Sequence, residues 1–172
     1  GVGTTVIVKI PFKIGTQDEN SNLSDKSVSL DDYSVEGMRA LVVEDNELNM
    51  EIARCILEES GMEVTCAADG KEAVEIFEKS EPDYFGVIYM DIMMPRLNGL
   101  DAARTIREMK RRDAMRVPII AMSANAFAED IINSRLAGMN VHLAKPLDAE
   151  KMIVALKQCM ADNRDVKLHE DL

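Results

Sequence analysis

The chain shows two alternating patterns of apolar and polar positions. Short continuous apolar runs are typical of strands buried on both faces of a parallel sheet, and apolar residues at helical spacing are typical of amphipathic helices. The apolar runs predict strands at 40–43, 63–67, 87–90, 117–122 and 141–144. A helical stretch follows each of them. This alternation predicts an α/β fold, a doubly wound five-stranded parallel sheet with helices on both faces.

Two of the predicted helices begin at residues whose side chains can cap a helix. Asn46 precedes the first helix and Asp148 precedes the last, and both residue types accept hydrogen bonds from the backbone N–H groups of a first turn. The apolar positions at helical spacing in the first helix are Leu48, Ile52, Cys55 and Ile56. These positions predict a helix between the first two strands.

Polar side chains follow four of the five predicted strands. Glu44 and Asp45 end the first, Asp91 the third, Ser123 the fourth and Lys145 the fifth. A doubly wound parallel sheet would bring these side chains to one edge, where such sheets bind ligands. Taken singly, each has a plainer interpretation as an acidic helix start, a turn residue or a solvated loop lysine. Their occurrence together at four strand ends favours a site.

The chemistry of these groups predicts a magnesium-dependent phosphoryl site. Three converging carboxylates repel one another unless a cation lies between them, and an all-oxygen ligand set suits Mg²⁺. The ammonium of Lys145 and the hydroxyl of Ser123 can neutralise and hydrogen-bond phosphoryl oxygens. Asp91 can then attack phosphorus to give an aspartyl phosphate.

Four segments together resemble the response-regulator receiver family. The resemblance covers residues 37–161 and implies a flavodoxin-like fold with strand order 2-1-3-4-5. It also implies that Asp91 accepts a phosphoryl group from a phosphohistidine. The four segments are Val42–Asn46, Met90–Pro95, Ala121–Ala124 and Leu143–Pro146.

The resemblance assigns further roles residue by residue. Asp45 would bind Mg²⁺ directly, Glu44 directly or through water, and the backbone carbonyl of Met93 would complete the protein ligands beside Asp91. Lys145 would pair with the phosphoryl group.

The resemblance also implies a conformational switch. Ser123 would move inward to the phosphoryl group as the switch hydroxyl. His142 stands where the family usually has an aromatic residue and sometimes histidine. Two interpretations of His142 stay open: it reorients when Ser123 moves, or it is a strand side chain packed under the fourth helix.

The segment before the predicted domain has a resemblance of its own. Gly1–Thr4 followed by a strand at 5–12 is similar to the last glycine box and final strand of a histidine-kinase ATP-binding domain. We therefore expect residues 1–14 to be the end of such a domain, 15–36 a linker, 37–161 the receiver and 162–172 a C-terminal tail. The rival interpretations are a cloning scar or an unrelated strand. We expect this piece neither to bind ATP nor to act as a kinase.

Composition limits the partners and the compartment. The formal net charge of −11 argues against nucleic-acid binding. Three separated cysteines without a C-x-x-C pair fit a reducing, cytoplasmic location, and the sequence lacks an apolar run long enough for a membrane span or a signal-peptide pattern. A local basic run is expected to be a solvated helix face and loop rather than a docking patch, and consists of Arg104, Arg107, Lys110, Arg111, Arg112 and Arg116.

The predicted function is that of the C-terminal receiver of a hybrid sensor histidine kinase. It would take phosphate from a histidine onto Asp91 and pass it to a histidine phosphotransfer protein or lose it to water. Whether it forms a homodimer is left open. One alternative is a receiver-like interaction module that is not phosphorylated. Another is a haloacid-dehalogenase-type phosphatase, which is disfavoured because that chemistry needs an aspartate where this chain has Met93.

Overall fold

The computed structural model describes residues 33–124 and 127–170 of the chain. The strand predicted at 5–12, with the rest of the predicted 1–14 segment, lies outside the described residues. The strands are β1 (Arg39–Val43), β2 (Glu63–Ala67), β3 (Val87–Asp91), β4 (Ile119–Ser123) and β5 (Val141–Ala144). The helices are α1 (Glu47–Glu59), α2 (Gly70–Lys79), α3 (Gly99–Glu108), α4 (Ala128–Leu136) and α5 (Ala149–Glu170).

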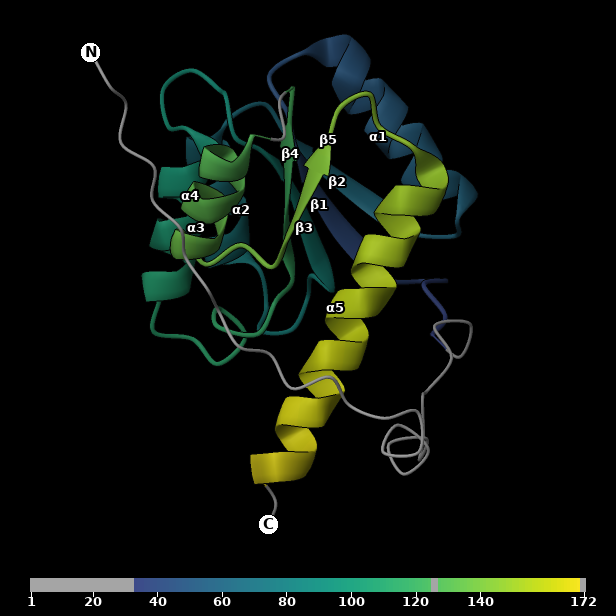
Figure 1. Cartoon of the computed structure of the whole chain (residues 1–172), viewed down its shortest axis with the longest axis vertical. Helices are drawn as coiled ribbons and strands as arrows, with labels where there is room; N and C mark the ends of the chain where they lie inside the picture. The colour runs from purple at the N-terminus through teal and green to yellow at the C-terminus, as the bar shows by residue number, and fades with distance from the viewer. Residues whose placement is uncertain (1–32, 125–126, 171–172) are drawn as a thin grey trace, which may run out of the picture.

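The strands form one parallel sheet in the order β2-β1-β3-β4-β5. Helices α1 and α5 cover one face, and α2, α3 and α4 cover the other (Figure 1). The predicted fold, a doubly wound five-stranded sheet with this strand order, is confirmed. Because all strands run in the same direction, their carboxyl ends meet at one edge, and the residues that follow β1, β3, β4 and β5 are brought together there.

Alternate residues of each central strand enter the two apolar layers, as the two-residue period of a strand requires. In β3, Ile88 and Met90 pack with α2 and α3, whereas Val87 and Tyr89 pack with α1 and α5. The Tyr89 hydroxyl donates to the carbonyl of Met152 over 3.0 Å, which ties β3 to α5. Burial raises the pKa of Tyr89, so its phenol keeps this proton.

The two predicted helix caps are present. The residues of α1 that are fully buried against the sheet are not the apolar residues named from the sequence. Asn46 accepts from the N–H of Asn49 over 3.0 Å, and Asp148 accepts from the N–H of Lys151 over 2.9 Å. On α1 the fully buried residues are Ala53 and Leu57, whereas Leu48 is 69% and Ile52 40% exposed. Ala53 and Leu57 therefore lie on the side of α1 that packs against the sheet.

Residues at the two ends of the predicted receiver range extend it in the structure. Tyr33 and Val35, from the range predicted as linker, are buried. Helix α5 continues through Glu170, into the range predicted as tail. Within the described residues, no helix is both long and apolar enough to span a membrane.

Most of the predicted basic run is engaged within the domain. Arg104 and Arg112 form ion pairs at the surface, and Arg107 donates to backbone carbonyls. Arg111 lies over the ring of Phe77, with 4.3 Å from its guanidinium carbon to the ring centroid. Asp113 accepts from Arg111 through both carboxylate oxygens, over 2.7 and 2.8 Å. This bidentate pair lies within the loop after α3 and orients the guanidinium, which fastens the loop to the end of α2 by donating to the carbonyl of Ser80 over 3.2 Å.

The buried carboxylate of Asp113 should stabilise the fold in a pH-dependent way. Hydrogen bonds from Arg111, and from the N–H of Asp83, lower the pKa of Asp113 to about 2 from an ordinary 3.8. The ionised carboxylate therefore adds about 2 kcal/mol to the free energy of unfolding. This contribution is present in full well above pH 3.8 and is lost as pH falls through about 2. Urea unfolding of Asp113→Asn should therefore show a loss of about 2 kcal/mol at neutral pH that shrinks below about pH 4. Asp101→Asn, which removes an exposed pair with Arg104, should cost under about 1 kcal/mol at any pH.

Candidate functional site

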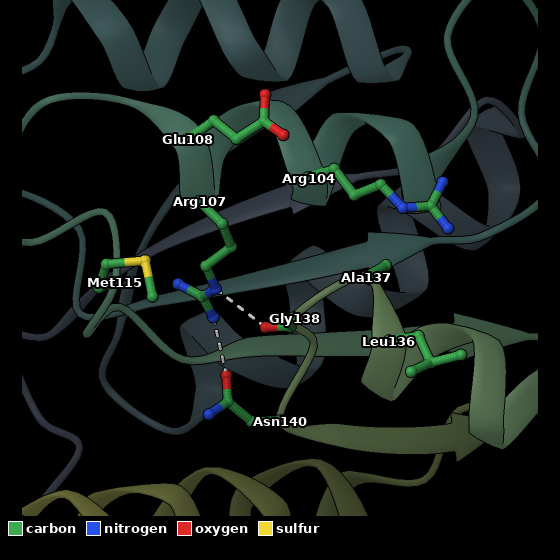
Figure 2. Close-up of a pocket in the computed structure, with 8 residues that line it drawn as sticks. All are labelled: Arg104, Arg107, Glu108, Met115, Leu136, Ala137, Gly138 and Asn140. Atoms are coloured by element: carbon green, nitrogen blue, oxygen red, sulfur yellow. Dashed lines mark hydrogen bonds between the residues drawn. The ribbon is translucent and has the colours of Figure 1, made fainter.

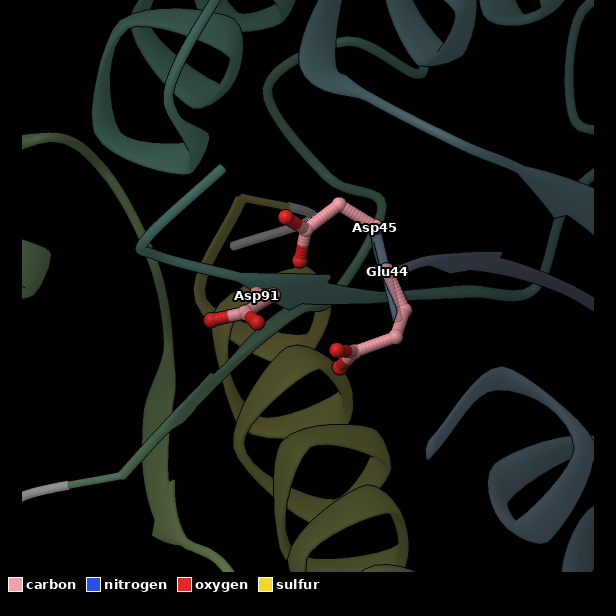
Figure 3. Close-up of side chains that lie close together, drawn as sticks. All are labelled: Glu44, Asp45 and Asp91. Atoms are coloured by element: carbon pink, nitrogen blue, oxygen red, sulfur yellow. The ribbon is translucent and has the colours of Figure 1, made fainter. Parts of the chain in front are cut away.

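Three carboxylates converge at the carboxyl edge of the sheet. Val43 of β1 lies beside Met90 of β3, so Glu44 and Asp45 emerge next to Asp91. One oxygen from each of the three carboxylates lies within 4.8 Å of the others, and Figure 3 shows the side chains gathered at the ends of the two strands. Glu44 and Asp91 are buried, whereas Asp45 is exposed. The cluster therefore reaches solvent at Asp45.

Lys145 bridges two of these carboxylates. Its Nζ donates to Oε2 of Glu44 and to Oδ2 of Asp91, each over 2.6 Å. Burial alone would lower the pKa of Lys145, but the hydrogen bonds and charges of the two carboxylates raise it. The pKa of Glu44 is raised, chiefly by burial and also by the charge of Asp91, although the hydrogen bonds from Lys145 and Asn49 lower it. The positive charge of Lys145 thus offsets the negative charge of two buried carboxylates, which would otherwise be costly to remove from water.

Two backbone N–H groups hold the loop that follows Asp91. The N–H of Met93 donates to Oδ1 of Asp91 over 3.0 Å, and the N–H of Gly99 donates to the carbonyl of Ile92 over 3.0 Å. A Cβ at Gly99 would overlap the carbonyl oxygen of Asp91, so only glycine allows α3 to start so close to the strand end. These contacts hold both the side chain of Asp91 and the backbone that follows it in place.

An ion pair holds the far end of the same loop. Arg96 pairs with the buried carboxylate of Asp69, the N-terminal cap of α2. The N–H of Gly70 donates to the carbonyl of Leu97 over 3.2 Å. The loop that carries Met93 is therefore bound to α2 as well as to β3.

Hydrogen bonds connect Ser123, at the end of β4, to helix α4 through His142. Asp91 pairs with Met122, so Ser123 is the next residue along the neighbouring strand. The Oγ of Ser123 lies 2.8 Å from Nε2 of His142, and Nδ1 of the same ring lies 3.2 Å from Oγ of Ser134 in α4. Ser134 is buried. His142 thus lies between β4 and α4, in contact with Ser123.

The structure brings the predicted site residues together and adds two that sequence reasoning missed. Asn49 donates to Oε1 of Glu44 over 3.1 Å, and Ser134 contacts His142. The only sequence signal for Asn49 was its place one turn after Glu44, in the first turn of α1. Ser134 could have been noticed as a polar residue on the inner side of a predicted helix.

A separate hollow of about 370 Å³ lies away from these groups, between α3 and the segment that leads into β5. Figure 2 shows Arg107 in this hollow, where it donates to the carbonyl of Gly138 over 2.9 Å and to Oδ1 of Asn140 over 3.0 Å. Burial lowers the pKa of Arg107 to about 10. Asn140 precedes β5, so the hollow lies toward the opposite edge of the sheet from Asp91. It is lined by Arg104, Arg107, Glu108, Met115, Leu136, Ala137, Gly138 and Asn140.

The arrangement of acidic residues, lysine and hydroxyl at one sheet edge agrees with the comparison to known families. The family model of the response regulator receiver domain matches residues 40–157. The chain belongs to the response regulator receiver family. It is a receiver domain of two-component signalling, and its matched range includes every strand of the sheet except the first residue of β1.

Relatives of this receiver domain include much longer proteins. Probable histidine kinase 2 of Oryza sativa subsp. indica is 35% identical over 137 residues, which cover 73% of this chain and 13% of the kinase. The peroxide stress-activated histidine kinase mak1 of Schizosaccharomyces pombe is 30% identical over 135 residues, which cover 78% of this chain and 8% of that protein. The chain therefore spans only a small part of these relatives.

A solved structure resembles the receiver domain along most of its length. It is the receiver domain of sensor histidine kinase PA1611 from Pseudomonas aeruginosa, with a magnesium ion coordinated in its active-site cleft. The two are 38% identical with a TM-score of 0.65, and the match covers 73% of this chain and 98% of that one.

Proposed function

We propose that this receiver domain accepts a phosphoryl group on Asp91 in a Mg²⁺-dependent reaction. The observation that carries the proposal is the convergence of the Glu44, Asp45 and Asp91 carboxylates around the strand ends, with Lys145 bonded to two of them. A lysine held between a metal-binding cluster and a nucleophilic carboxylate is placed for phosphoryl chemistry.

The donor set fits Mg²⁺. Carboxylate oxygens on a partly exposed edge suit a hard cation that keeps several waters, and the magnesium-bearing receiver of PA1611 supports the assignment. Glu44, Asp45, Asp91 and the backbone carbonyl of Met93 would hold the ion. When bound, Mg²⁺ supplies positive charge that offsets the charge developing on the phosphoryl oxygens.

The remaining steps use the chain's own residues. A carboxylate oxygen of Asp91 attacks phosphorus as the bond to the donor histidine nitrogen breaks, and the bonding electrons leave with the imidazole. Lys145, already bonded to Asp91, turns its ammonium to the incoming phosphoryl oxygens. Ser123 donates its hydroxyl hydrogen to one of these oxygens, and this draws it away from His142.

The proposal extends to the protein from which the chain comes. The rice and fission yeast relatives are histidine kinases, of which the chain covers 13% and 8%. We propose that the parent is a hybrid sensor histidine kinase, with residues 1–14 as the last strand of its ATP-binding domain and the residues between 14 and the buried Tyr33 as the linker. The phosphodonor would be a phosphohistidine of that kinase or of a partner chain, and the recipient a histidine phosphotransfer protein.

Magnesium dependence of phosphorylation tests the proposal. Intact mass spectrometry after incubation with acetyl phosphate should show a gain of one phosphoryl group with Mg²⁺ and none with EDTA, because the cluster needs a cation to offset the incoming charge. The same samples are examined by circular dichroism, and Mg²⁺ binding is measured by titration calorimetry. A folded, Mg²⁺-binding protein that gains no mass from acetyl phosphate or from a phosphohistidine donor would instead be an interaction module.

A further inference from the structure

The two oxygens of the Glu44 carboxylate contact different parts of the chain. Oε2 accepts from Nζ of Lys145 over 2.6 Å, and the same Nζ donates to Oδ2 of Asp91 over 2.6 Å, so Oε2 lies on the side that faces the carboxylate cluster. Oε1 accepts from Nδ2 of Asn49 in α1 over 3.1 Å. Because Glu44 is buried, its side chain is oriented by these protein contacts. The direction of the carboxylate is therefore set from α1 as well as from Lys145.

Asn49 is the third residue of α1, and its side chain does not make the contact that is usual at that position. Glu or Gln there commonly accepts from the backbone at the start of the helix. Glu72, at the same position of α2, accepts from the N–H of Ala68 over 2.7 Å. Asn49 instead directs its amide N–H to Glu44, while its own backbone N–H donates to the side chain of Asn46. A carboxylate at this position would repel that of Glu44, so a neutral donor fits the contact.

We propose that Asn49 is a positioning residue that turns Oε2 of Glu44 toward the magnesium site and keeps it there when Mg²⁺ is bound. This inference rests on the proposed function, in which Glu44 helps to hold Mg²⁺ and Lys145 turns to the phosphoryl group. Lys145 then leaves Oε2, whereas Asn49 stays bonded to Oε1. Hydrogen-bonded partners of metal ligands fix the orientation of those ligands in this way. Asn49 thus holds Glu44 in one orientation before and after Mg²⁺ binds.

Removal of the Asn49 amide should weaken Mg²⁺ binding. In Asn49→Ala, Glu44 keeps its charge but its carboxylate can rotate, so directing Oε2 to the metal becomes a cost of binding. The dissociation constant for Mg²⁺, measured by titration calorimetry, should rise about 10-fold, the lower end of the range for removed partners of metal ligands. Asn49→Leu has a similar size and fills the space in which a water could replace the amide, so it should show at least the same rise. Alanine and leucine both favour helices, so α1 should stay folded.

A matched variant separates this effect from general damage to a helix. Asn133→Ala removes an amide from α4, which covers the other face of the sheet, and should leave the Mg²⁺ affinity unchanged. If Asn49 served only the start of α1, Asn49→Ala would change the free energy of unfolding in urea and bind Mg²⁺ as tightly as wild type. That result would overturn the proposal.

The contact itself is followed by NMR of the Asn49 side-chain amide in the whole chain, whose signals are assigned by their loss in Asn49→Leu. One N–H should be protected from exchange with water before Mg²⁺ is added and stay protected at saturating Mg²⁺, because the bond to Oε1 is kept. Loss of that protection on Mg²⁺ binding would overturn the proposal, since Asn49 would then be released together with Lys145. Failure of the wild type to bind Mg²⁺ would overturn the proposed function and this inference with it, whereas wild-type affinity in Asn49→Ala would overturn the inference alone.

Discussion

Replacement of Asp91 by asparagine should abolish phosphorylation. The amide keeps the size of the side chain and an oxygen that can accept from the N–H of Met93, so the loop after β3 should stay in place. It removes the anionic oxygen that attacks phosphorus and one of three carboxylates of the cluster. Intact mass spectrometry after incubation with acetyl phosphate and Mg²⁺ should find no phosphoryl group on Asp91→Asn. Mg²⁺ affinity should also fall, by about tenfold for the loss of one charged ligand.

A second acidic variant separates loss of the nucleophile from loss of charge. Asp101→Asn removes a carboxylate from the first turn of α3, where it accepts from Arg104 and lies outside the cluster. It should be labelled as fast as wild type. Labelling of Asp91→Asn at the wild-type rate would place the acceptor elsewhere and contradict the role given to Asp91. Loss of labelling in both variants would point to net charge instead of a specific nucleophile.

The sheet could be predicted from the sequence because burial on both faces leaves a direct signal. A strand covered by helices on both sides has no polar face, so its run of apolar residues ends where the sheet ends. The polar residue that follows is then at the edge, as with Asp91 after β3 and Lys145 after β5. Because the strands are parallel, their carboxyl ends all lie at the same edge of the sheet. The positions of the candidate site residues therefore follow from hydrophobic pattern and topology.

Side-chain contacts between elements were beyond the sequence pattern. Ser134 contacts His142 only because α4 packs against β5, and no spacing along the chain links the two. The side of α1 that meets the sheet was likewise not given by the apolar spacing, which predicted the helix itself: Ala53 and Leu57 are fully buried, whereas Leu48 and Ile52 are exposed.

Replacement of Lys145 by methionine should change phosphorylation and metal binding in opposite directions. Methionine has a similar length and no charge, so phosphoryl transfer to Asp91 loses the ammonium that offsets charge on the phosphoryl oxygens. The rate of labelling by acetyl phosphate should fall about 100-fold. Mg²⁺ should bind about tenfold more tightly, because no ammonium then competes for the oxygens of Glu44 and Asp91, each 2.6 Å from Nζ. Time-resolved intact mass and titration calorimetry measure the two effects.

Unfolding of the variant could not produce this combination of a slower labelling rate and tighter Mg²⁺ binding. A variant that had lost its fold would bind Mg²⁺ more weakly and be labelled more slowly, so both quantities would move together. Lys151→Met, at an exposed lysine in the first turn of α5, should change neither. If Lys145→Met bound Mg²⁺ more tightly but kept the wild-type rate, the ammonium would serve only to compensate buried carboxylates in the absence of metal. A lower labelling rate together with tighter Mg²⁺ binding would have a different meaning. In that case the Lys145 ammonium opposes Mg²⁺ binding but favours phosphoryl transfer, so it must leave the two carboxylates and act on the phosphoryl group.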